Sequence, residues 1–165
     1  MPTEKEHINV VWLKRDLRLQ DNEVISNAFK TGKRTLLIYV FEHLIINDKH
    51  YSERHFNFIK ESLKDINLQL EANNTKVLTV TSDISSAFNQ LQEFYKIDTV
   101  FSHVETGLLV TYNRDKEFKR YCRNNFIEWI ESKNNGVERG LVNRDNWFES
   151  WETYMTAAQE AFHPK

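Results

Sequence analysis

The sequence of 165 residues has little of what marks several classes of protein. Cys122 is its only cysteine, so no disulfide can form within the chain, which suits a reducing compartment. The first ten residues lack the apolar stretch of a signal peptide, and no apolar run approaches the ~20 residues that cross a bilayer. We therefore expect a cytoplasmic, soluble chain with no membrane partner.

Glycine (4) and proline (2) are also scarce, which argues against flexible linkers. Residues 10–31 contain no glycine, although classical dinucleotide and P-loop sites need glycines where the backbone approaches phosphate. The six histidines include His50 and His55, whose spacing of five does not place two metal ligands on one helical face. The sequence thus argues against both a phosphate cradle and a zinc site.

What the chain does contain is a regular alternation of short apolar runs and longer amphipathic stretches. Four runs rich in apolar and β-branched residues predict strands, at residues 8–13, 35–41, 76–81 and 99–104. Between and after them, residues 22–29, 52–72, 84–95 and 112–131 have the apolar spacing of helices. This order predicts an α/β fold with a doubly wound parallel sheet, whose ligand site lies beyond the carboxyl ends of the strands.

Individual residues fit this pattern. Asp21 or Asn22 is placed to cap the first helix, and Gly32 to end it. Cys122 and Trp129 are expected on the apolar stripe of the last of these helices, where Cys122 acts as a small buried hydrophobe.

The loop after the first strand is unusually charged: Lys14, Arg15, Asp16 and Arg18 follow the apolar run 8–13. One interpretation is a clamp on an anionic ligand, in which Arg15 or Arg18 binds the anion and Asp16 holds one of them. The other is an internal salt-bridge cluster that joins this loop to neighbouring strand ends.

The same stretch, WLKRDLRLQDN at residues 12–22, resembles the signature that opens photolyases and cryptochromes. Residues 15–18, Asp21 and Asn22 match it, whereas Leu13 and Lys14 depart mildly. Three further stretches are similar to the family: SERHFNFIKESL (52–63), HVETGLLVTYNRD (103–115) and the tryptophan-rich segment 129–155.

This resemblance implies the amino-terminal α/β domain of the family, a Rossmann-like five-stranded parallel sheet of order 3-2-1-4-5 that binds an antenna chromophore. It implies a domain at residues 1–135, followed by an exit segment at 136–165 that leads to a helical domain holding FAD. The resemblance also implies that this partner domain, the groove for damaged DNA and the family's chemistry lie outside these 165 residues. The chain alone is therefore expected to be inactive, as a fragment of a longer protein or a free-standing antenna domain.

The antenna pigment implied by the resemblance is a folate, deazaflavin, lumazine or flavin. Arg54 matches a helix arginine that contacts a deazaflavin in some relatives, and Glu105 lies in a loop that contacts the antenna. His103 lies in the same loop but departs from the family's usual acidic or amide residue. The full set of candidate cofactor-binding residues is Trp12, Lys14, Arg15, Phe41, Glu42, Arg54, His103 and Glu105. Three further apolar residues are expected to line the wall of the pigment site: Leu13, Val40 and Val104.

Neither a metal site nor a catalytic residue is expected in this chain. Arg114 and Asp115 are interpreted as a packing salt bridge at a helix start. Trp129, Trp147 and Trp151 are interpreted as packing aromatics, not electron carriers, and the last two as anchors against the absent domain.

Three functions stay open on the sequence. The chain is the antenna domain of a DNA-repair photolyase (a carbon–carbon lyase when complete), a domain of a cryptochrome-like photoreceptor, or a pigment-free domain that braces the FAD domain. Apart from the resemblance, a nucleotide-binding module or a flavodoxin-like carrier would have the same fold class.

Overall fold

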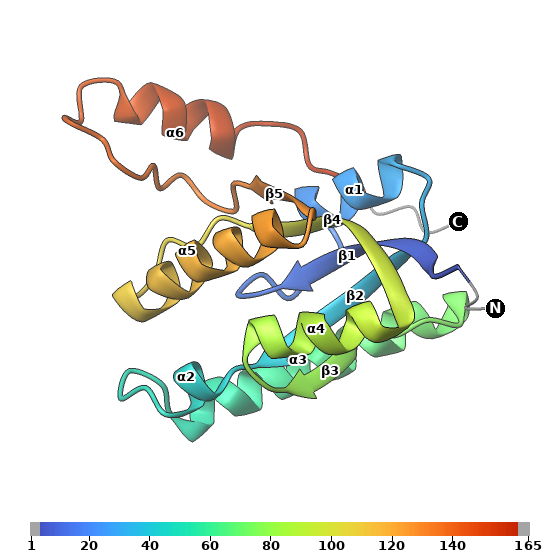
Figure 1. Ribbon diagram of the computed structural model, residues 1–165. Coiled ribbons are helices and arrows are strands. Elements are labelled where there is room, and N and C mark those ends of the chain that lie inside the picture. The colour runs from blue at the N-terminus through green and yellow to red at the C-terminus, as the bar shows by residue number, and fades with distance from the viewer. Residues whose placement is uncertain (1–3, 162–165) are drawn as a thin grey trace.

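The computed structural model describes residues 4–161, which form a parallel sheet between two layers of helices (Figure 1). The five strands are β1 (Glu6–Leu13), β2 (Thr35–Phe41), β3 (Leu78–Thr81), β4 (Tyr95–His103) and β5 (Glu128–Ser132). Their order is β3-β2-β1-β4-β5, with every neighbouring pair parallel. The predicted α/β class and the 3-2-1-4-5 order are therefore confirmed.

The register of the sheet brings the strand ends together. Leu13 pairs with Tyr39 near the end of β2, and Phe41 pairs with Thr81 at the end of β3. The segments that follow the central strands therefore emerge at one edge, which is where a doubly wound sheet binds ligands.

Each face of the sheet is covered by its own pair of helices. Helices α4 (Ile84–Phe94) and α5 (Leu109–Asn124) cover one face, and α1 (Glu23–Lys30) and α3 (Glu53–Leu70) cover the other. The strands alternate accordingly, with Val10 and Trp12 in the first core and Val11 and Leu13 in the second. Burial on both faces explains why residues 8–13 of β1 form a nearly continuous apolar run, which Asn9 alone interrupts.

The helix boundaries follow local signals in the sequence. Asn22 caps α1, because its side chain accepts a hydrogen bond from the Ile25 amide at 3.2 Å, and Gly32 follows the helix at φ +68°. Ser52 and His55 form a reciprocal cap at the start of α3. The short helix α2 (His43–Ile46) and the 3₁₀ turn η1 (Glu71–Asn73) complete this half of the chain.

Two predicted boundaries are wrong, and both concern strands that follow a helix closely. Tyr95 begins β4 directly after α4, instead of ending the helix. The helix predicted over 112–131 ends at Asn124, and Trp129 lies on β5, a strand that the apolar pattern missed. Phe126, at φ +56°, makes the reversal between α5 and β5, and Trp129 still packs on the α5 side of the sheet.

Beyond β5 the chain forms a loop and helix α6 (Trp147–Met155), which lies apart from the sheet (Figure 1). The chain then returns to α1, where the backbone of Glu160 accepts a hydrogen bond from the Asp21 amide at 2.8 Å. Of the predicted boundaries 1–135 and 136–165, residues 1–3 and 162–165 lie outside the described part. Within residues 4–161, none of the helices has the length and apolar character that crossing a bilayer requires.

Candidate functional site

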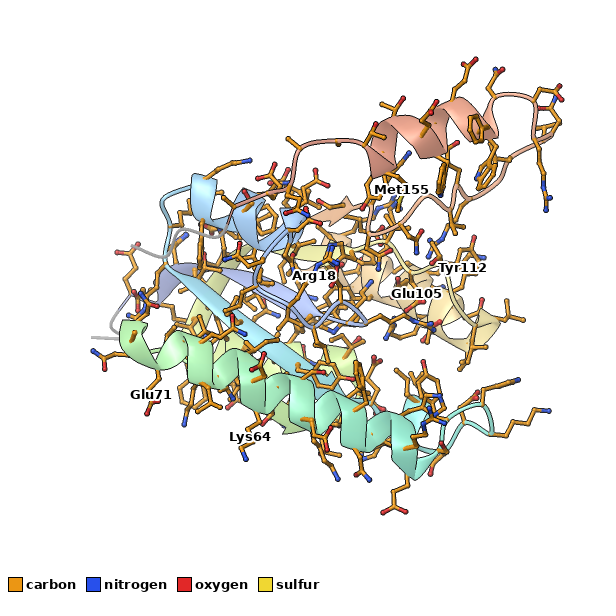
Figure 2. The ribbon with its side chains drawn as sticks, turned by 180° about the vertical axis from the view of Figure 1, so that it is seen from behind. Arg18, Lys64, Glu71, Glu105, Tyr112 and Met155 are labelled. Carbon is orange, nitrogen blue, oxygen red and sulfur yellow. The ribbon has the colours of Figure 1, made fainter. Side chains whose placement is uncertain are left out.

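A cavity of about 670 Å³ opens at the carboxyl ends of β1 and β2, between the starts of α3 and α5. Figure 2 shows Glu105 on the side of the molecule where α3 begins, whereas Glu71, just after α3, lies on the opposite side. The lining combines apolar and aromatic residues with charged residues from the strand ends, from α3 and from α5. Its apolar and aromatic members are Trp12, Leu13, Leu17, Tyr39, Val40, Ile45, Tyr51, Phe58 and Ile59.

Trp12 lies beside two of these charged residues, Lys14 and Arg114. Its ring packs edge-on against Phe118 with centroids 4.9 Å apart. The Lys14 ammonium lies 4.4 Å from the Trp12 ring centroid, and the Arg114 guanidinium carbon lies 4.7 Å from it. The ring therefore attracts two buried cations through its π face, and Phe118 fixes its orientation.

Arg114 is the centre of a buried ionic network. Its Nε donates to Asp115 Oδ1 at 2.8 Å, its Nη2 to Glu105 Oε2 at 3.3 Å, and its Nη1 to Glu42 Oε1. Asp115 Oδ2 in turn accepts from Lys14 Nζ at 2.9 Å. The network joins the ends of β1 and β2, the loop after β4 and the body of α5.

Burial shifts the proton affinities of this network. It raises the pKa of Glu42 to about 7, although Arg114 pulls the value down. It also lowers the pKa of Lys14, against the attraction of Asp115. Breaking such a network from one side leaves an uncompensated buried charge, so its members depend on one another.

Arg15 forms the rim of the cavity. Its Nε lies 3.1 Å from Glu105 Oε1, which also accepts from the Gly107 amide at 2.8 Å. Its Nη2 donates to the Tyr51 hydroxyl at 3.3 Å. A Cβ at residue 107 would collide with the Arg15 guanidinium, so glycine is required there for this arrangement.

The candidate residues fall into two groups in the structure. Trp12, Lys14, Arg15, Glu42, Arg54 and Glu105 line the cavity. Phe41 lies in a second hollow beside α3, and His103 lies near Asp16, with Nε2 3.7 Å from Asp16 Oδ2. Of the further wall residues, Leu13 and Val40 line the cavity, and Val104 lies beside the loop that follows β5.

The charged loop of residues 14–19 forms the internal salt bridges of the second interpretation, and the clamp on an anion stays a prediction. Lys14 belongs to the buried network, Arg18 pairs with Asp16 at 3.3 Å, and Arg15 reaches the cavity rim. Arg114 lines the cavity as well as forming the expected salt bridge with Asp115, and both lie inside α5, beyond its first turn. Tyr39, Tyr51 and Ile45 were not among the candidates, although the first two are aromatic residues close to predicted strand or helix ends.

The arrangement is suited to binding a small molecule that is partly apolar. Apolar walls supply burial, Arg15 and Arg54 supply positive charge at the opening, and the buried network supplies fixed polar atoms at the inner end. A volume of this size lies within the usual range of small-molecule sites, about 300–1,000 Å³.

Known proteins that are similar to this chain share its fold and indicate its family. The family model described as DNA photolyase matches residues 9–160. Among curated proteins, the chloroplastic/mitochondrial cryptochrome DASH of Solanum lycopersicum is 27% identical over 105 residues, covering 60% of this chain and 18% of that protein. Cryptochrome-1 of Drosophila melanogaster is 25% identical over 130 residues, covering 74% of this chain and 24% of that protein.

Solved structures of low sequence identity share the fold. An archaeal photolyase from Sulfolobus tokodaii with two FAD molecules matches with a TM-score of 0.73 at 18% identity, over 93% of this chain and 36% of that one. A class III photolyase from Agrobacterium tumefaciens matches with a TM-score of 0.73 at 17% identity, over 96% of this chain and 33% of that one. The chain thus spans about a fifth to a third of these proteins, the part that forms their amino-terminal domain.

Proposed function

The chain belongs to the DNA photolyase family, and we propose that it binds an antenna chromophore in the cavity at the ends of β1 and β2. The observation that carries the proposal is the cavity itself. It combines the predicted residues Trp12, Arg15, Arg54 and Glu105 with a size and an apolar wall suited to a planar pigment.

Four pigment classes fit this description: folates, deazaflavins, lumazines and flavins. Each offers a flat ring for the apolar wall and polar ring edges for the inner end. The Sulfolobus tokodaii photolyase is described as holding two FAD molecules, with the implication of a novel light-harvesting cofactor. That description supports the inclusion of a flavin among the pigments to be tested.

We further propose that this domain serves a larger flavoprotein in which a helical domain holds FAD and carries out light-driven repair of pyrimidine dimers. The segment 136–161 supports this, because it exposes Phe148 (58%), Met155 (55%) and Val142 (100%) along α6 and its preceding loop. Such a surface suits contact with a second domain. The activity belongs to the larger protein, with this chain as its light-collecting part, and the proposed location is the cytoplasm.

A cryptochrome-like photoreceptor is the second candidate, because both curated relatives reported above are cryptochromes. The photolyase and photoreceptor roles are separated by an assay of cyclobutane dimer repair under blue light, with the protein that includes the helical domain. Repair supports the photolyase role. Light-induced FAD chemistry without repair supports the photoreceptor role.

Pigment binding is tested by titrating the chain with one pigment of each class and recording absorption spectra. We expect one pigment to bind at one-to-one stoichiometry with a shifted band. Arg54→Ala should weaken binding at least tenfold, whereas Lys60→Ala, on the same helix outside the cavity, should not. If no pigment changes its absorption spectrum on mixing with the chain, the antenna role is contradicted. The chain would then be a pigment-free domain that braces the FAD domain.

A further inference from the structure

One carboxylate oxygen of Glu42 is buried and accepts no hydrogen bond from the described residues. The residue is 2% exposed and lines the inner end of the cavity. Its Oε1 accepts from Arg114, whereas its Oε2 has no hydrogen-bond partner among the described residues. Buried polar atoms are nearly always paired, because an unpaired one keeps its full desolvation cost, so this exception calls for a physical reason.

The other carboxylates of the network do not share this feature. Both oxygens of Glu105 are occupied, by Gly107 and Arg15 on one side and Arg114 on the other. Both oxygens of Asp115 are occupied, by Arg114 and Lys14. Each of the three nitrogens of the Arg114 guanidinium already donates to a carboxylate oxygen, and none of their N–H groups is hydrogen-bonded to Glu42 Oε2.

We propose that Glu42 Oε2 accepts a hydrogen bond from a ring N–H of the bound ligand, and that the cavity thereby selects planar heterocycles with such a donor. This inference rests on the proposed function and deepens it. An amide-type N–H flanked by carbonyl or amino groups occurs on the pyrimidine ring of flavins, deazaflavins, lumazines and pterins. A carboxylate accepts this donor strongly in a site shielded from water, since charge-assisted hydrogen bonds are the stronger kind.

The protonation of Glu42 agrees with this role. Its pKa is raised to about 7, so part of the population carries a proton near neutral pH. Because Arg114 donates to Oε1, the proton is expected on Oε2. A protonated Oε2 is a hydrogen-bond donor, so it would repel the N–H donor of the ligand. Binding should therefore favour the carboxylate form and release up to one proton. The charged or titratable groups around Glu42 are Arg114 and Asp115 from α5, Lys14 after β1, Glu105 from the loop after β4, and Tyr39 on β2.

The test compares ligands with and without the ring N–H. The probes are riboflavin, 8-hydroxy-5-deazariboflavin, 6,7-dimethyl-8-ribityllumazine and 5,10-methenyltetrahydrofolate, each beside its 3-N-methyl analogue. The chain should bind the N–H form of its pigment at least tenfold more tightly than the methyl form. Calorimetry in two buffers of different ionisation enthalpy should show proton release near pH 6.5.

The matched variants are Glu42→Gln and Glu131→Gln. A glutamine that keeps its oxygen on Arg114 turns an NH₂ donor toward the ligand, so the preference for the N–H form should fall below threefold and proton release should vanish. Glu131 lies 3.9 Å from Lys14 outside the cavity, so its variant should keep both properties. Because the preference is a ratio within one variant, a loss of overall stability does not affect it.

The outcomes separate this inference from the function on which it rests. Binding without a preference for the N–H form, or a preference that survives in Glu42→Gln, overturns the role of Glu42 alone. Failure of all four pigments to bind overturns the antenna function, and the role of Glu42 with it.

Discussion

Arg114, in the second turn of α5, donates a hydrogen bond to Glu42, which lies 72 residues earlier at the end of β2. Both side chains are almost fully buried. The pair fixes the helix on one face of the sheet to the strand end that forms the inner wall of the cavity. Its geometry therefore links the stability of the fold to the shape of the site.

Arg114→Met should destabilise the fold strongly. The variant leaves three buried carboxylates, Glu42, Glu105 and Asp115, with Lys14 as the remaining buried cation of the network. Removing one partner of a buried ion pair leaves an uncompensated charge, which costs on the order of 3–5 kcal/mol. Urea unfolding followed by circular dichroism measures this free energy. Arg120→Met, at an exposed position of the same helix, should change it by less than about 0.5 kcal/mol. Equal effects of the two variants would contradict the role of the network.

His103 should make the fold sensitive to acid. Burial lowers its pKa to about 4, with Arg18 and Lys14 adding to the effect, whereas the unfolded value is 6.5. The unfolded chain therefore binds more protons between these values, and stability is lost as the pH falls through this window. Between pH 7 and pH 5 the contribution is about 2 kcal/mol, which His103→Asn should remove from the pH dependence. The exposed His50→Asn serves as the control, and an unchanged pH profile in His103→Asn would refute the prediction.

Gly107→Ala should disturb the rim of the cavity without unfolding the protein. The added Cβ would lie 2.6 Å from Glu105 Oε1 and collide with the guanidinium of Arg15, a half-exposed side chain that can swing away. We expect a loss of pigment affinity of about tenfold with a stability cost below about 1.5 kcal/mol. Leu109→Ala, at a largely exposed position nearby, controls for the loop. Affinity equal to that of the unmodified chain would show that Arg15 does not position the ligand.

Cys122 should be inert in the folded protein. It lies on the buried face of α5 and is 2% exposed, and burial raises the pKa of its thiol to about 12. Iodoacetamide at pH 8 should leave the native chain unmodified over a period in which it fully alkylates the chain in 8 M urea. Rapid alkylation of the native chain would mean that α5 opens locally or packs differently.

Most of the sheet and its helices can be predicted from the sequence, because strands that are buried on both faces are rich in apolar residues. The runs at 8–13 and 35–41 are nearly continuous in apolar residues, so β1 and β2 were found close to their observed bounds. The strand β5 was missed because its side chains are largely exposed apart from Trp129 and Ser132. Trp129 and Ile130 also continue the apolar spacing of α5, so nothing in the pattern marked the turn at Phe126.

The site was predictable only in part. Lys14, Arg15 and Glu42, which follow strands in the sequence, line the cavity because parallel strands end at one edge of the sheet. Phe41 and His103 also lie near strand ends, but strand alternation directs their side chains elsewhere. The central position of Arg114 depends on the packing of α5 against β1 and β2, which a single sequence does not specify.

If the cavity at the ends of β1 and β2 holds the pigment, filling the cavity should abolish binding. Ile45→Trp adds a large side chain to the wall, whereas Ile130→Trp places the same side chain at an exposed position on β5. Absorption titrations with the four pigments should show a one-to-one shifted band in the unmodified chain and in Ile130→Trp, and its loss in Ile45→Trp. An unchanged band in Ile45→Trp would place the pigment elsewhere and contradict the account.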